Sequence, residues 1–118
     1  MQYQSDYILR LIEQMGSLIR QALSRVGVRD SEESLELIDQ AVVLALAVDP
    51  AVARRLAPES LAALIELNVT DDRVIALLAE ALHAEAEILE GQAELMEASL
   101  RRSQAEAVQA LLDPGRAN

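Results

Sequence analysis

The segment from Asp6 to Leu23 has the periodicity of an α-helix, and apolar side chains cover more of it than a surface helix needs. At 100° per residue its apolar positions sweep about 200° of arc, whereas one supporting layer requires a stripe of about 100°. A helix of this kind is packed on two sides. It therefore organises either the fold of its own chain or a contact with another chain.

Ala and Leu dominate the 118 residues, and few segments alternate apolar and polar residues with the period of two that strands require. We therefore predict an all-α fold, a five- to six-helix bundle with a tetratricopeptide-like C-terminal hairpin. Residues 1–112 are expected to form a single all-α domain, and residues 113–118 a disordered tail.

Capping residues and prolines predict where the helices begin and end. Near the N-terminus the expected signals are Ser5 or Asp6 as first N-cap, Gly27 as C-terminal glycine, and a capping box of Asp30 with Glu33. The second helix then runs to about Val48. Because it is apolar nearly all round, it is predicted to be the central buried helix of the bundle.

Asp49-Pro50 and Ala57-Pro58 predict two short helices, 51–56 and 58–67. Thr70 is expected to cap a long helix over 71–90, and a turn at 91–93 leads to a last helix ending at Leu112. Gly91 is the reason for placing that turn, because glycine weakens a helix by about 1 kcal/mol relative to Ala. One long kinked helix over 71–112 is the alternative. The predicted core includes Leu11, Met15, Leu18, Leu44, Leu78 and Leu82.

The chain carries a net charge of −10. Binding of nucleic acid and of anionic membranes depends on basic side chains, so both are disfavoured as partners. The longest apolar run, 41–48, is far short of the roughly 20 residues that span a bilayer. The start of the chain lacks the basic region of a signal peptide, so a cytoplasmic location is expected.

Few residues could support catalysis or bind a metal. The chain has no Cys and no Lys, and His83 is its only histidine. We therefore predict no catalytic residue, no cofactor and no metal ligand. Glu80 and His83 do have the E-x-x-H spacing of di-metal helix bundles, but His83 falls on the polar side of its predicted helix. Whether this pair ever binds metal stays open at this level.

Glu85 falls in the middle of an apolar arc. A lone buried carboxylate is costly, so this candidate buried charge should meet an Arg, a backbone N–H or water. An ion pair between two helices is the preferred interpretation.

The opening of the chain resembles a family of bacterial proteins of unknown function that begin with an Asp-Tyr-Ile-x-Arg-x-Ile helix. The matching residues are Asp6, Tyr7, Ile8, Arg10, Ile12 and Met15. Segments 41–50 and 105–114 echo each other as Ala/Leu helices that end at Asp-Pro, and 72–112 resembles a degenerate tetratricopeptide hairpin. These resemblances imply an all-α fold and no known activity.

The sequence favours a non-enzymatic helical module for protein–protein interaction or self-association, expected as a homodimer with a further protein partner possible. The alternative is a small-ligand or metal-binding helical bundle, either with or without weak enzymatic activity. The candidate interface comprises Ile8, Ile12, Met15, Ile19 and Leu23 on the first helix. If it is an interface, Arg at Ile12 or Ile19 should give a folded monomer.

Overall fold

Six α-helices and one short 3₁₀ helix, with no strand, make up the part of the chain that the computed structural model describes, residues 2–24 and 31–113. The elements are α1 (Gln2–Ser24), α2 (Ser31–Leu46), α3 (Pro50–Arg55), α4 (Pro58–Asn68), α5 (Asp72–Gly91), α6 (Leu95–Gln109) and η1 (Ala110–Leu112). This confirms the all-α helical bundle. The predicted tail lies almost entirely outside the described residues.

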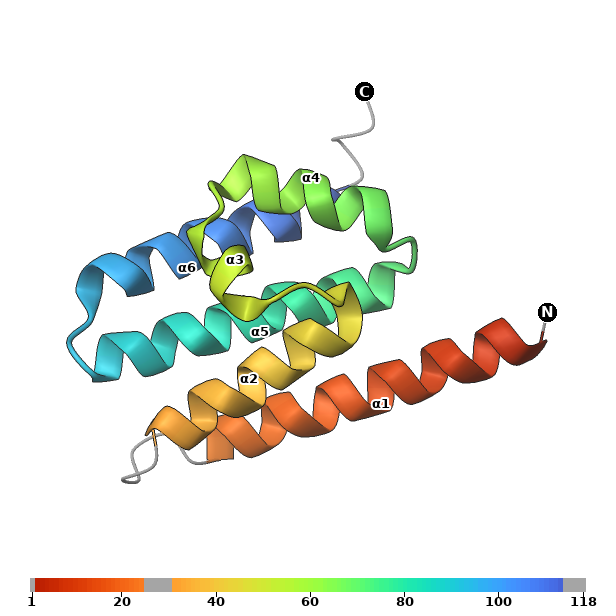
Figure 1. Ribbon diagram of the computed structural model, residues 1–118, viewed down its shortest axis with the longest axis horizontal. Helices are drawn as coiled ribbons and strands as arrows, with labels where there is room; N and C mark the ends of the chain where they lie inside the picture. The colour runs from red at the N-terminus through yellow and green to blue at the C-terminus, as the bar shows by residue number, and fades with distance from the viewer. Residues whose placement is uncertain (1, 25–30, 114–118) are drawn as a thin grey trace.

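Two antiparallel hairpins build the bundle (Figure 1). The α1–α2 hairpin packs against α5, and α5 pairs along its length with α6. The α4 helix lies on α6, and the short α3 lies between α2 and α6. The helix α5 therefore belongs to one hairpin and packs against the other.

Two prolines mark the starts of short helices, as the sequence predicts. Asp49 caps α3, since its carboxylate accepts a hydrogen bond of 2.9 Å from the backbone N–H of Ala51, and Pro50 occupies the first position of the helix. Pro58 begins α4 in the same way. The cap of α5 is Asp71 rather than Thr70, because the Asp71 carboxylate accepts from the N–H of Arg73 at 2.9 Å.

The predicted start of the first helix is wrong. The helix begins at Gln2 and passes through Ser5 and Asp6, which therefore cannot be its N-cap. Ser and Asp have only modestly poorer helix propensity than neighbouring residues, so a cap signal does not by itself break a helix. The predicted signals at Gly27 and Asp30 lie outside the described residues.

A turn separates α5 from α6, so the predicted turn at 91–93 is confirmed and the single long helix is wrong. The backbone N–H of Glu94 donates to the carbonyl of Leu89 at 2.9 Å, and that of Ala93 donates to Glu90 at 3.0 Å. These two bonds form a Schellman motif, which needs a left-handed residue at the position of Ala93. Ala93 has φ 63°, so the left-handed residue of the turn is this alanine and not Gly91.

Replacing Ala93 by Gly should raise the free energy of unfolding by about 0.5–1 kcal/mol. A left-handed conformation strains an L-residue by roughly 1–2 kcal/mol, and the greater flexibility of Gly in the unfolded chain offsets part of the gain. Urea unfolding of the two proteins measures the difference. As a control, Ala76→Gly on the exposed side of α5 should lower stability by about 1 kcal/mol. Destabilisation by both substitutions would contradict the strain at Ala93.

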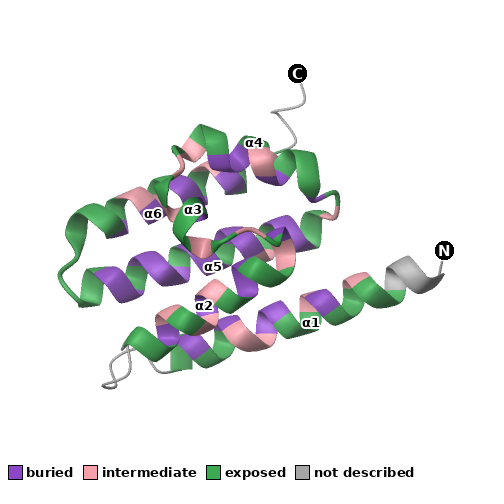
Figure 2. Cartoon of the chain, in the orientation of Figure 1, coloured by how far each residue is buried: buried purple, intermediate pink, exposed green. Residues whose placement is uncertain are grey.

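The core lies around α5, and its buried side chains follow one another along that helix (Figure 2). Leu11, Met15, Leu78 and Leu82 are buried as predicted, and Leu18 is half-buried. The prediction for Leu44 is wrong, because 40% of this residue is exposed. The outer side of α2 faces solvent, so the central helix of the bundle is α5 and not α2.

Candidate functional site

The apolar arc of α1 is covered mainly by its own chain. Met15 and Ile19 are buried in the core, Ile12 packs against that core, Ile8 is half-buried, and Leu23 lies exposed at an edge. Met15 and Ile19 are therefore packing residues and are not available to a second chain. Arg at Ile19 would place a charge in the core, so that substitution cannot serve as the test of an interface.

The two residues with di-metal spacing lie on the exposed side of α5. His83 borders an open surface hollow of about 340 Å³, together with Glu106 and Gln109 of α6 and the segment that follows it. In residues 2–24 and 31–113, no three His, Asp or Glu side chains lie close enough together to hold a metal ion. The geometry thus gives the E-x-x-H pair no further ligand.

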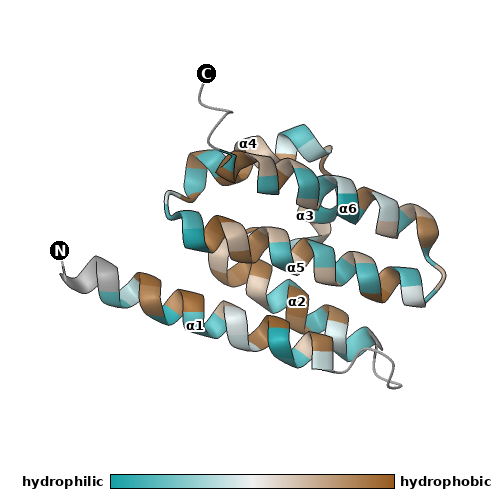
Figure 3. Ribbon diagram, turned by 180° about the vertical axis from the view of Figure 1, so that it is seen from behind, coloured by the Kyte–Doolittle hydropathy of each residue, from teal (hydrophilic) through white to brown (hydrophobic). Residues whose placement is uncertain are grey.

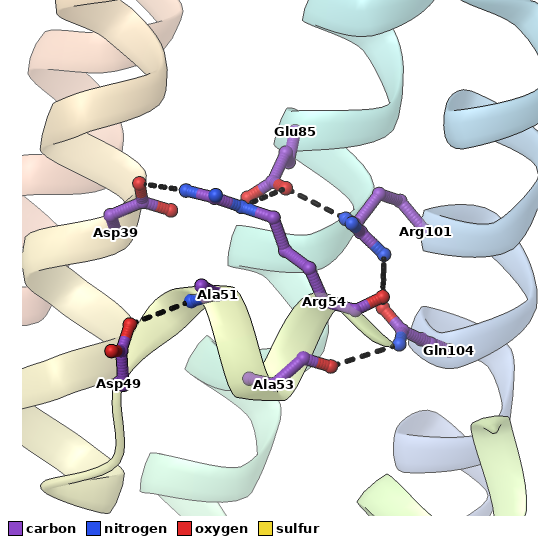
Figure 4. Close-up of polar contacts among 8 residues, drawn as sticks. All are labelled: Asp39, Asp49, Ala51, Ala53, Arg54, Glu85, Arg101 and Gln104. Carbon is purple, nitrogen blue, oxygen red and sulfur yellow. Dashed lines mark hydrogen bonds and ion pairs between the residues drawn. The ribbon is translucent and has the colours of Figure 1, made fainter. Parts of the chain in front are cut away.

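Glu85 is buried, 4% exposed, as its place in the apolar arc predicts. Arg101 of α6, itself 3% exposed, donates from Nε to Oε1 of Glu85 at 2.7 Å. Nε of Arg54 on α3 lies 3.8 Å from the same oxygen, and the other end of that guanidinium pairs with Asp39 of α2 (Figure 4). Two carboxylates and two guanidiniums therefore balance each other between α2, α3, α5 and α6.

The same cluster also caps α3. Arg101 donates from Nη1 to the backbone carbonyl of Arg54 at 2.9 Å and to Oε1 of Gln104 at 3.0 Å. Nε2 of Gln104 donates to the carbonyls of Ala53 at 3.2 Å and Leu56 at 2.8 Å. Carbonyls in the last turn of a helix have no intrahelical donor, so α6 supplies these donors to the six-residue α3.

Burial raises the pKa of Glu85 above its ordinary value, and the hydrogen bond and charge of Arg101 oppose this rise. Burial likewise raises the pKa of Asp39, with Arg54 acting against it. The partly open pocket among these side chains is about 10 Å³, room for roughly one water molecule. The charge cluster therefore holds helices together and leaves no space for an organic ligand among its side chains.

The sequence did not reveal the partners of Glu85, although a signal for them exists. Ala98, Ala105 and Val108 are buried on one face of α6, and Arg101 recurs with them at helical spacing. A lone Arg in the apolar stripe of one helix is therefore a sequence signal for the partner of a lone Glu in the apolar stripe of another helix. Gln104 lies next to Ala105 and is also fully buried.

The outer side of the first hairpin carries two hollows that meet at Leu44. One, of about 390 Å³, is lined by Leu18, Asp39, Gln40, Val43, Leu44 and Pro50. The other, of about 200 Å³, lies between Leu44, the Tyr7 end of α1 and the connection from α4 to α5. We call the surface of Tyr7, Leu18, Gln40, Val43 and Leu44 the α1–α2 face.

No protein-family model matches the chain, and no curated protein or solved structure matches it either. The resemblance of the first helix to a bacterial family, like that of the C-terminal hairpin to a tetratricopeptide hairpin, therefore stays a prediction. Among the described helices, none combines the length and the apolar character needed to cross a membrane.

Proposed function

We propose that this protein is a non-enzymatic helical module that acts by contact with another protein surface, through the α1–α2 face. The observation that carries this proposal is the exposure of Leu44 and Val43, with Tyr7 nearby, around two adjoining hollows. Contiguous exposed apolar side chains on a small protein usually mark an interface. An apolar side chain of a partner could fill either hollow.

The chemistry of this surface suits a protein partner better than other classes of ligand. With a net charge of −10, the chain is repelled by nucleic acid and by anionic lipid. Interfaces between proteins are depleted of charged residues at their centre and often contain Tyr. Tyr7, Leu44 and the uncharged Gln40 fit that pattern.

The C-terminal hairpin adds support through its sequence resemblance to a tetratricopeptide hairpin. Repeats of that kind work by presenting surfaces to partners and not by catalysis. The buried charge cluster also favours a contact role, because its charges are used to hold α3 and its cavity is nearly filled.

Affinity purification of the tagged chain from its native host tests the proposal. We expect the wild-type chain to retain specific proteins, and we expect Leu44→Arg to lose them because the substitution places a charge between the two hollows. Leu67→Arg is the matched control, since Leu67 is 83% exposed on α4, outside the α1–α2 face. An identical set of retained proteins for all three chains would contradict the proposed role of this face.

A further inference from the structure

We infer that the occupant of the α1–α2 face is a second copy of this chain, paired about a two-fold axis close to Leu44. This inference rests on the proposed function and names its partner. Leu44 is the natural centre because it borders both hollows. In a two-fold contact the same patch serves both copies, so each Leu44 would lie beside a hollow of the other.

The distribution of charge permits pairing with a second copy of the same net charge. Two copies with a net charge of −10 each repel one another unless their contact region is uncharged. The exposed residues that continue the face on α1 are Gln14 and Gln21, which carry no charge, and the basic Arg10, so none of them is acidic. Asp39, at the edge of the larger hollow, is neutralised by Arg54. The other acidic side chain that lines the hollows, Asp71, is paired with Arg73. A basic partner would therefore have to compete with Arg54 and Arg73 for these two aspartates.

The nearest exposed acid on the same side of α2 is Glu36, one helical turn before Gln40. If the two α2 helices pair antiparallel about an axis close to Leu44, their N-terminal halves lie on opposite sides of that axis. The two Glu36 side chains then lie at opposite ends of the contact, roughly 24 Å apart at 1.5 Å per residue. Over that distance, water and salt screen their repulsion.

The length of α1 also favours a second copy. It has 23 residues and α2 has 16, which correspond to roughly 35 Å and 24 Å of helix. In Figure 1 the N-terminal end of α1 extends past the neighbouring ends of α2 and α5, and Figure 3 shows hydrophobic residues along much of the rest of α1. Tyr7, which lies beside the connection from α4 to α5, is largely exposed. A second hairpin laid across the face would cover part of the N-terminal end of α1.

The size of the face sets the strength of association to expect. The length of α2 and two helix widths of about 10 Å give roughly 500 Å² per copy. About 1,000 Å² in total lies at the small end of specific interfaces. We therefore expect a reversible dimer that forms in the micromolar range rather than an obligate one.

Sedimentation equilibrium of the purified full chain, from about 1 to 500 µM, measures this association. The wild-type chain should change from monomer to dimer within that range. Leu44→Arg should weaken the dimer at least tenfold while its circular dichroism stays that of a folded helical protein, and Leu67→Arg should behave as wild type. A wild-type chain that is still monomeric at 500 µM would overturn the inference, as would equal weakening by the two substitutions.

Disulfide trapping provides a second readout that does not depend on the arginine variant folding. The chain has no cysteine, so a single one can be introduced at Leu44 or at Leu67. Leu44→Cys should form a covalent dimer under mild oxidation much faster than Leu67→Cys, because a residue beside the axis meets its own copy. Equal rates would contradict the two-fold pairing.

The two proposals can fail separately. If the purified chain is monomeric and a different protein is captured in a Leu44-dependent way, the two-fold pairing is overturned and the proposed function stands. If neither association nor capture depends on Leu44, both are overturned. Capture of an untagged copy of the chain itself supports both.

Discussion

Replacing Arg101 by Met should lower the free energy of unfolding by about 3–5 kcal/mol at neutral pH, the cost of breaking a buried ion pair on one side. Glu85 would keep its charge in the core, and among the described residues its remaining ion-pair partner would be Arg54, 3.8 Å away. The carbonyl of Arg54 and Oε1 of Gln104 would each lose a donor as well. Urea unfolding at pH 7 followed by circular dichroism measures the loss.

The adjacent residue offers a matched control. Arg102 makes an exposed ion pair with Glu90 at 3.0 Å, and pairs of that kind contribute about 0–1 kcal/mol. Arg102→Met should therefore cost much less than Arg101→Met. Equal losses would mean that the buried cluster does not fasten α3 to the bundle.

The loss caused by Arg101→Met should depend on pH with a definite sign. Burial already raises the pKa of Glu85, and removing Arg101 removes the strongest influence that opposes this rise. A carboxyl whose pKa is higher in the folded chain binds its proton there first, so lowering the pH through that range stabilises the folded state. The difference between variant and wild type should be smaller at pH 5 than at pH 8. A difference that grows as the pH falls would contradict the burial of an unpaired Glu85.

Replacing Leu78 by Ala should cost about 2–5 kcal/mol, because a packed core collapses only partly around a deleted side chain. Leu78 is 1% exposed at the centre of α5. The same substitution at Leu44, which is 40% exposed, should cost less than about 1 kcal/mol, since its side chain is only partly removed from water. Denaturant unfolding of the two variants at a concentration below dimer formation compares them directly. Equal costs would mean that α2 is as central to the bundle as α5.

Local signals in the sequence predicted most of the elements. Asp49-Pro50 and Pro58 act through short-range chemistry, a side-chain cap and a fixed backbone angle, so they predict the starts of α3 and α4 without knowledge of the rest of the chain. Glu85 stood out for a similar reason, since a carboxylate in an apolar arc needs a partner wherever that arc packs. The broad apolar arc of α1 correctly indicated packing on more than one side, by α2 and α5.

The apolar arc of α1 could not show whether its own chain or a partner chain covers it. Periodicity says how much of a helix is apolar, but not which neighbour covers it, so Met15 and Ile19 had the same pattern as interface residues and proved to be core. Leu44 shows the converse, because α2 is apolar nearly all round yet packs on its inner side alone.

Propensity, capping and the cost of burying a charge all act locally, so the amino-acid order was enough to predict the all-α class, the starts of α3 and α4, and the need of Glu85 for a cation. Three other features became visible in the folded chain: α5 is the central helix, Arg101 and Gln104 join Glu85 while capping α3, and Leu44 is the exposed residue shared by two hollows. These features depend on contacts between helix faces, and in the charge cluster the contacting residues are 16 to 51 positions apart in the sequence. That pairing is set by the packing of the whole bundle.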